Sequence, residues 1–279
     1  CKNPGEAVGR RGANVNEIRD KAGWIPIVER TPPLLSKTVH DIRGYRQVNA
    51  EERRKLLKNF GLNIHRPKRP GSMWARVTAL GSYREVGRAC HLVTTNESRI
   101  MIDVGVNVAN DNDPMPFFNA PEALPVDKLD AVILTHAHLD HAGMLPILFK
   151  YGYRGPVYCT PPTRDLMLLL QTDYLKIGGS EGKMAPYSME DIRTCQRHVV
   201  DVAWDQTTDI APDVKMTFSN SGHILGSSAV HLHIGDGKHN LLFSGDQKYE
   251  KSWLFDAANT RFPRVESLVL ESTYGSEGD

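Results

Sequence analysis

The chain contains, at residues 131–143, the stretch AVILTHAHLDHAG, in which an apolar run precedes four side chains that can bind a metal. These four follow within six residues of Thr135: His136, His138, Asp140 and His141. Residues two apart in an extended segment point to the same side, so His136 and His138 can face one ion. Asp140 and His141 lie where we expect the chain to turn into a helix, so they can face a second point nearby. The spacing favours two ions over one, and over unrelated capping or packing residues.

Two further candidate ligands occupy loops that follow strand-like runs. His223 lies in SGHILGSS, and Asp246 ends LLFSGD. Loops at the edge of a sheet are where binding sites are built. Taken singly, each residue is more often part of a turn. Together with the cluster at 136–141, the interpretation as ligands is favoured.

The other polar candidates receive supporting or structural interpretations. Asp103 ends an apolar run, and ligating histidines need a carboxylate or carbonyl on their other ring nitrogen, so we expect Asp103 to hold one of them. His231 and His233 alternate with apolar residues, which is typical of the polar face of a strand. His91 follows Cys90 in an apolar strand and is expected to be a packed core residue.

The charge of the chain is unevenly distributed. Its 34 basic and 33 acidic residues give a net charge of +1. Residues 1–70 carry 16 Lys and Arg against 7 Asp and Glu, a net charge of +9, whereas residues 71–279 carry 18 against 26, a net charge of −8. A basic segment ahead of an acidic body indicates a polyanionic partner, nucleic acid first, or else a solvated surface.

Composition excludes several classes of protein. The chain is 40% hydrophobic and 24% charged, which is ordinary for a globular protein. No apolar run reaches the roughly 18–20 residues of a membrane span, and no signal segment opens the sequence. The four cysteines form no C-x-x-C pair, which argues against a disulfide scaffold and a cysteine zinc finger. We therefore expect a cytoplasmic protein with no membrane contact.

Two regions are expected, separated by the basic, proline-rich linker at 66–71. In the region 1–70 we expect a helix at 14–22, a strand at 24–29 that ends before Pro32-Pro33, and a helix at 50–60 capped by Asn49. The chain begins at Cys1 and stops soon after a strand-like run, so we expect it to be a piece of a longer protein.

The region 71–279 alternates short strands with a few helices, which predicts an α+β or layered α/β fold. Expected strands are 74–79, 90–94, 99–103, 131–135, 157–159, 199–202, 215–219, 229–234, 241–243 and 268–270. Expected helices are 141–150, 163–177 and 189–198, the last with Ser188 and Asp191 as a capping box.

The motif at 136–141, with its distant histidine and aspartate, resembles the metallo-β-lactamase superfamily. Residues 81–88 are similar to the first loop of the β-CASP nucleases, and residues 271–275 to their first acidic motif. The glycine loop at 9–12, before a helix, resembles the last KH domain of archaeal homologues of the cleavage and polyadenylation specificity factor nuclease. The resemblance covers essentially the whole chain. It implies a layered αββα sandwich, incomplete in its C-terminal part, preceded by a partial KH domain.

The resemblance also implies a zinc site and its chemistry. His136, His138 and His223 would hold one zinc, Asp140 and His141 the second, and Asp246 would bridge them. Nitrogen and oxygen ligands suit Zn²⁺ but also accept iron or manganese. Two such ions activate a water that attacks phosphorus and leaves a 3′-hydroxyl and a 5′-phosphate. The catalytic residues by this likeness are Asp140, Asp103 and Glu271, the last orienting a histidine general acid.

The same resemblance places three parts beyond residue 279: the β-CASP lid, the general-acid histidine and the last zinc-ligating histidine. The second zinc therefore lacks one ligand in this chain, and we expect this piece to be a weak or inactive nuclease. A homodimer formed through that further part is expected as well.

Single-stranded RNA is the expected partner, together with the transcription machinery. Glycines flanking arginines let backbone N–H groups approach phosphates, so Gly9, Arg10, Arg11 and Gly12 are expected to bind RNA; the alternative is a simple basic turn. The expected function is an endonuclease in RNA 3′-end formation or transcription termination. The alternatives are a 5′-3′ exoribonuclease, a glyoxalase II-like hydrolase and a non-catalytic RNA-binding subunit.

Overall fold

The computed structural model describes residues 1–28, 30, 31, 34, 36–110, 112–182, 184–273 and 275, without the side chains of residues 38 and 39. Contacts divide the chain into two compact units, Cys1–Arg43 and Gly44–Asp279. In the part of the chain that the structure describes, none of the helices combines the length and the apolar character that crossing a bilayer requires.

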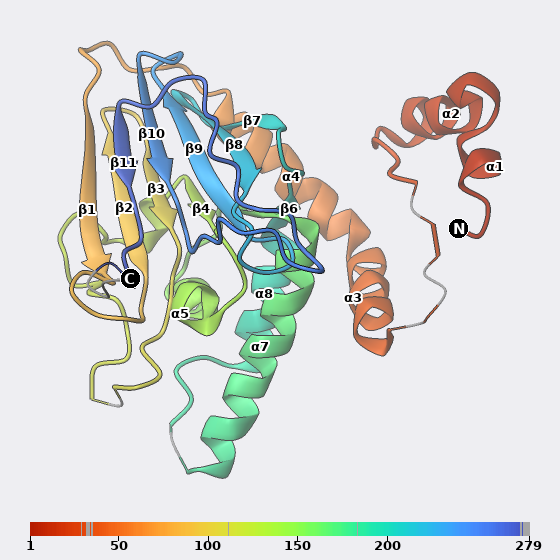
Figure 1. Ribbon diagram of the computed structural model, residues 1–279. Coiled ribbons are helices and arrows are strands. Elements are labelled where there is room, and N and C mark those ends of the chain that lie inside the picture. Colours follow the sequence, from red (N-terminus) through yellow and green to blue (C-terminus); the bar gives the residue numbers. More distant parts are fainter. Residues whose placement is uncertain are drawn as a thin grey trace. The chain divides into compact units, whose positions relative to one another are not determined.

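The second unit contains two sheets (Figure 1). The first has the order β1-β2-β3-β4-β5-β6; β1 to β3 are antiparallel and β3 to β6 are parallel. Its strands are β1 (Ala75–Gly81), β2 (Cys90–Thr95), β3 (Arg99–Ile102), β4 (Ala131–Ile133), β5 (Val157–Cys159) and β6 (Val199–Asp201). The second has the order β11-β10-β9-β8-β7, antiparallel except for the parallel pair β10 and β11. Its strands are β7 (Thr207–Ala211), β8 (Val214–Asn220), β9 (Ser228–Ile234), β10 (His239–Phe243) and β11 (Ser267–Val269).

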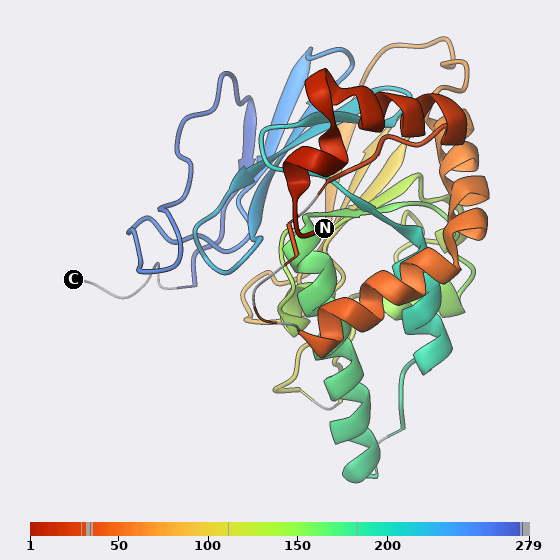
Figure 2. The ribbon, with the colours of Figure 1, turned by 90° about the vertical axis from the view of Figure 1, so that its right-hand side faces the viewer.

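Two apolar clusters hold the layers together. One lies between the sheets, with Val93 and Ile133 from the first and Phe218 and Leu232 from the second. The other packs the opposite face of the first sheet against helices. These helices are α5 (Leu139–Ala142), α6 (Leu145–Lys150), α7 (Pro161–Ser180) and α8 (Met189–His198). The two longest of these, the green and the teal helix of Figure 2, lie side by side. A short 3-10 turn, η2 (Val126–Lys128), precedes β4.

The layers are therefore helix, sheet and sheet, with α4 (Ala50–Ile64) in contact with β7 of the second sheet. The expected αββα order has a second helical layer on the far side of the second sheet; on the outer face of β9, the described chain is instead irregular. His231 of β9 lies against the carbonyl of Arg264 and the ring of Phe262 there.

Most of the expected elements agree with the structure to within a few residues, and Ser188 and Asp191 form the expected capping box. Two differences concern the body of the fold. The single helix expected at 141–150 is two helices, because the N–H of Met144 donates to the carbonyl of Val104 and diverts the backbone. Strand β7 was not expected, because its sequence TTDIA lacks a clear apolar alternation.

The first unit begins with α1 (Pro4–Val8), a 3-10 turn η1 (Arg10–Gly12) and α2 (Ala13–Ala22), which ends at Gly23 as expected. The strand expected at 24–29 is wrong for residues 24–28, which contain a bend at Trp24 and belong to no strand. A strand needs a neighbour to satisfy its backbone groups. Glu29, Pro32 and Pro33 lie outside the described residues.

Helix α3 (Lys37–Val48) was not expected and crosses the division between the units. It leads directly into α4 (Ala50–Ile64). Asn49 is the N-cap residue of α4 as expected, but its side chain makes no capping hydrogen bond. It donates instead to the carbonyl of Tyr45 in α3. Helix α4 continues past Gly61. The division after Arg43 is one of contacts within the chain, and the domain boundary expected at 66–71 stays a prediction.

Candidate metal centre

The segment that carries His138, Asp140 and His141 is fixed by hydrogen bonds to neighbouring backbone. Ala89 N–H donates to the carbonyl of Asp140 at 2.8 Å, and Val104 N–H donates to that of His141 at 2.7 Å. Between these contacts, a Cβ on Gly105 would lie 1.6 Å from the carbonyl oxygen of Asp140. Only glycine allows this approach. The position of α5 is thus set by residues more than thirty positions earlier.

The loops of His223 and Asp246 are tied to each other. Lys248 N–H, two residues after Asp246, donates to the carbonyl of Ser221 at 2.9 Å. Gly222 has a left-handed φ of 71°, and a Cβ there would lie 2.5 Å from the carbonyl of Lys248. The loops follow β8 and β10, which both run antiparallel to β9 and therefore end at the same edge of the second sheet. The two ligand candidates therefore approach the 136–141 segment together.

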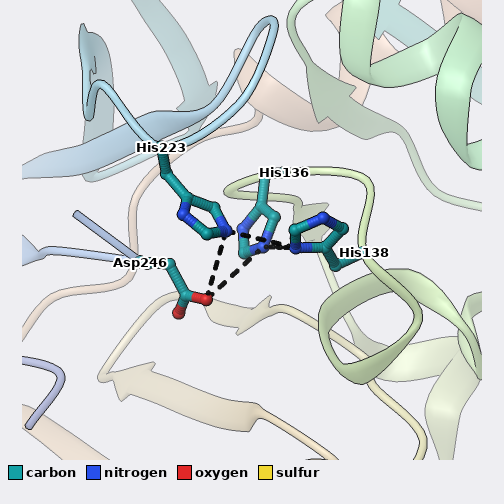
Figure 3. Close-up of side chains that lie close together, drawn as sticks. All are labelled: His136, His138, His223 and Asp246. Carbon is teal, nitrogen blue, oxygen red and sulfur yellow. Dashed lines mark hydrogen bonds and ion pairs between the residues drawn. The ribbon is translucent and has the colours of Figure 1, made fainter. Parts of the chain in front are cut away.

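Four side chains converge on a first point (Figure 3): His136, His138, His223 and Asp246. Nδ1 of His138 lies 3.2 Å from Nε2 of His136 and 3.2 Å from Nε2 of His223. Oδ2 of Asp246 lies 3.8 and 3.5 Å from those same Nε2 atoms. Ligand atoms about 2.0–2.1 Å from a tetrahedral zinc lie about 3.3 Å apart. The spacing of the donor atoms therefore fits a tetrahedral metal ion.

A second group lies beside the first and consists of His136, Asp140 and His141. Nε2 of His141 lies 3.8 Å from Oδ2 of Asp140 and 3.2 Å from Oδ1 of Asp246. Asp246 thus presents one oxygen to each group. All six ligand candidates expected from the sequence are brought together, in an arrangement that can hold metal ions.

Asp103 supports this arrangement from within the fold, with 2% of its surface exposed. Its Oδ2 lies 2.8 Å from Nδ1 of His141 and accepts from the hydroxyl of Thr135, while its Oδ1 accepts from the backbone N–H of Thr135. The hydroxyl of Thr135 also lies 3.0 Å from Nδ1 of His136. The sequence interpretation missed this role of Thr135; its place directly before the first histidine is the only signal for it.

Burial and charge set the protonation of the cluster. Burial, together with the neighbouring histidines, holds the pKa of His136 well below its ordinary value, so this ring is neutral. Burial also lowers the pKa of His141, but the carboxylates of Asp103 and Asp246 outweigh it and hold that pKa well above its ordinary value. Burial alone would raise the pKa of Asp246, yet its histidine neighbours lower it. The carboxylates are therefore ready to compensate cationic charge.

A cavity of about 630 Å³ opens beside the second group. Asp103, Asp140, Asp246 and Glu271 all line it. Glu271 is placed by its backbone N–H, which donates to the hydroxyl of Ser244 at 3.0 Å. The expected motif at 271–275 therefore reaches the site, although Tyr274 lies outside the described residues.

The expected loop at 81–88 forms another wall of this cavity. Ser82, Arg84 and Arg88 have left-handed φ angles of 67°, 62° and 44°. The guanidinium of Arg88 holds the loop by pairing with Glu85 and Asp113, each at 2.6 Å. His91 also lines the cavity, its ring 5.3 Å from that of Phe243, so it is packed as expected but faces the site.

The glycine loop Gly9–Gly12 lies apart from the metal centre in sequence and belongs to the first unit. Gly9, Arg11 and Gly12 have φ angles of 75°, 54° and 79°. Arg10 and Arg11 are exposed. The loop joins α1 to α2, and the side chain of Asn14 fastens it by donating to the carbonyl of Glu6 at 2.9 Å.

The chain is similar to known proteins. A model described as metallo-beta-lactamase superfamily matches residues 83–274. Transcription termination factor FttA of Methanosarcina mazei is 53% identical over 276 residues, which is 99% of this chain and 43% of that protein. The protein of the same name from Pyrococcus abyssi is 49% identical over 286 residues, covering 100% of this chain and 44% of its own length. The chain thus spans less than half the length of these relatives.

Among solved structures, a metallo-beta-lactamase from Cronobacter sakazakii, a HARLDQ motif mutant, is 19% identical with a TM-score of 0.42 and covers 60% of each chain. The match to the superfamily model includes every ligand candidate and all strands of the two sheets except β1. Because this match extends over more than half of its residues, the chain belongs to the metallo-beta-lactamase superfamily.

Proposed function

We propose that this chain is the metal-bearing part of a ribonuclease that cleaves single-stranded RNA in transcription termination or RNA 3′-end formation. The observation that carries the proposal is Asp246, whose two oxygens face two neighbouring groups of ligand atoms. The name of the relatives, transcription termination factor, supports the biological setting. Because this chain spans less than half the length of these relatives, the activity of the whole protein is also a proposal.

Zinc is the ion that we propose for both positions. Held there, a pair of zinc ions would lower the pKa of a water molecule and neutralise charge on a phosphodiester. His136, His138, His223 and Asp246 would hold one ion, and Asp140 and His141, with Asp246, the other. Asp103 would keep the Nδ1 proton of His141 directed toward its own carboxylate, so that Nε2 is free to ligate. Glu271, in the wall of the cavity, would orient the histidine that acts as general acid.

RNA binding by the first unit is a second part of the proposal. A loop with two glycines and two exposed arginines between two helices is the arrangement with which KH domains clamp a nucleic-acid backbone. Replacing Arg10 and Arg11 with aspartate should weaken RNA binding and flatten its dependence on salt. Unchanged binding would remove the KH interpretation.

The test of the reaction compares two substrates on the purified chain loaded with zinc. We expect slow cleavage of a fluorescent single-stranded RNA and none of a glutathione thioester. His136→Ala should abolish the cleavage, and His231→Ala, a histidine outside the cluster, should retain it. Hydrolysis of the thioester with RNA left intact would overturn the proposal, as would RNA cleavage that survives His136→Ala. An RNA circle, which has no 5′ end, separates endonuclease from exonuclease action.

A further inference from the structure

The segment between β10 and β11, residues 247–264, begins directly after Asp246 and exposes large apolar side chains. Trp253 is fully exposed, at 104% of its reference surface, while Leu254 is 83% and Tyr249 59% exposed. Figure 2 shows this segment as the irregular blue chain that projects from the second sheet. Tryptophan is well buried on average, and large exposed apolar groups on a soluble unit mark interaction sites. The fold itself makes no use of the Trp253 ring as core.

The tip that carries Trp253 is a closed turn. Ser252 N–H donates to the carbonyl of Phe255 at 2.9 Å, and Phe255 N–H donates to the hydroxyl of Ser252 at 3.0 Å. Lys251 and Asp256 form an ion pair across the turn at 3.0 Å. These contacts restrain the backbone that carries the two central residues, which reduces the backbone entropy lost when a ligand binds.

The base of the segment is fastened to the ligand loops. Lys248 donates to Ser221 and accepts from the backbone N–H of Ala258. The side chain of Asn220 donates to the carbonyl of Ala257 at 3.2 Å. Trp253 is five residues from Lys248, so their α-carbons lie within about 18 Å of each other. A strand held at the metal centre therefore needs only a few nucleotides to reach the indole.

The charge of the segment favours RNA over protein as its occupant. Residues 247–264 carry four basic and two acidic residues, within a region, 71–279, whose net charge is −8. Lys248 and Lys251 flank the exposed aromatic rings, whereas the cores of protein interfaces are depleted in lysine. Aromatic rings interleaved with basic side chains are the composition with which proteins bind single-stranded nucleic acids.

We propose that Trp253 is a stacking platform for a nucleobase of the single-stranded RNA whose phosphodiester lies at the metal centre, with Tyr249 as a second contact. Stacking is tolerant of sequence because every base has a planar face. The platform would therefore set the path of the strand without selecting its sequence. This inference rests on the proposed action on RNA.

The test measures binding without cleavage. The full chain, with metal removed by EDTA, is titrated onto a fluorescein-labelled 12-nucleotide oligouridylate and followed by anisotropy. We expect Trp253→Ala to weaken binding about fivefold or more, and Trp253→Phe to retain most of the affinity. The slope of log affinity against log salt should not change, because no charge is lost. Tyr151→Ala, an aromatic that is 54% exposed after α6, is the matched control and should bind like wild type.

The same series in a background with Arg10 and Arg11 replaced by aspartate prevents binding at the glycine loop from hiding the effect. Equal affinity of Trp253→Ala and wild type in that background would overturn the platform. Light scattering tests the other occupant: a change in oligomeric state on Trp253→Ala, with the affinity for RNA unaltered, would assign the surface to a protein contact instead. Binding that depends on Trp253, with RNA cleaved neither by this chain nor by the longer protein, would remove the proposed nuclease and leave the platform standing.

Discussion

Two histidine pairs of the form H-x-H occur in this chain, and they have different surroundings. In His136-Ala137-His138 the ring centroids are 4.9 Å apart, and in His231-Leu232-His233 they are 4.3 Å apart. The first pair faces a third histidine and the carboxylate of Asp246. In the second pair, Nε2 of His231 lies 2.9 Å from the carbonyl of Arg264. His233 lies between the side-chain oxygens of Thr217 and Asn240.

The difference teaches that spacing nominates a metal site and that position in the sheet decides it. The second pair lies inside β9, where its ring nitrogens meet neutral groups of neighbouring chain. The first pair lies just beyond the end of β4, where loops from both sheets deliver a histidine and carboxylates. Neutral acceptors satisfy imidazoles, whereas a convergence of imidazoles with carboxylates leaves donor atoms that a cation can share.

The largest expected effect separates the two pairs directly. His136→Ala removes a side chain that belongs to both groups. We therefore expect zinc affinity to fall by more than the roughly 10–100-fold that follows loss of an outer partner, and the zinc content to fall with it. His231→Ala should leave the zinc content unchanged. Elemental analysis of the two purified variants beside wild type measures this. Equal zinc in all three would break the comparison.

Asp103→Asn sharpens the comparison of the two histidine pairs, because it removes a carboxylate charge that lies beside the first pair and not beside the second. We expect zinc affinity to fall about 10–100-fold. In wild type, the raised pKa of His141 means that a proton must leave before Nε2 can ligate, so affinity should drop as pH falls through that pKa. Without the Asp103 carboxylate the pKa of His141 falls, so the loss of zinc affinity on acidification should begin at a lower pH than in wild type. Competition with a chromogenic chelator follows both effects; an unchanged profile would contradict them.

A third kind of histidine extends the comparison. His198 is buried against Phe149, and burial lowers its pKa to about 4. The His198 ring takes up a proton near pH 6.5 in the unfolded chain but only near pH 4 in the folded chain. Its contribution to the free energy of unfolding is therefore fully present above pH 6.5. That contribution, up to about 3 kcal/mol, should be lost as the pH falls toward 4. Urea unfolding at several pH values should show a smaller loss in His198→Gln; equal losses would show that other groups are responsible.

The smallest effect concerns the second pair alone. His231→Phe leaves the carbonyl of Arg264 without the imidazole, and we expect about 1 kcal/mol less stability. Urea denaturation should detect this loss while zinc content stays equal to wild type. A loss of zinc with His231→Phe would mean that the two pairs are not independent.

The sequence predicted which side chains come together better than it predicted where helices and strands begin and end. All six ligand candidates meet, and Asp103 contacts His141, because a strand end followed by closely spaced ligands leaves few alternatives. The split between α5 and α6 depends on a contact from Met144 to Val104 that no local pattern encodes. For the same reason residues 24–28 look like a strand in sequence but form none: whether a partner strand is available depends on the tertiary structure.

The loop at 81–88 has a consequence for motion. Three of its non-glycine residues hold left-handed backbone, at a cost of order 1–3 kcal/mol each, and the guanidinium of Arg88 opposes that cost through its pairs with Glu85 and Asp113. Opening of this loop relieves the strain of its backbone, so we expect it to cost less free energy than opening of the sheets. An open loop would let a bound molecule exchange with bulk solvent while the metal centre stays in place. The amides of the loop should then lose hydrogen-exchange protection long before those of β4.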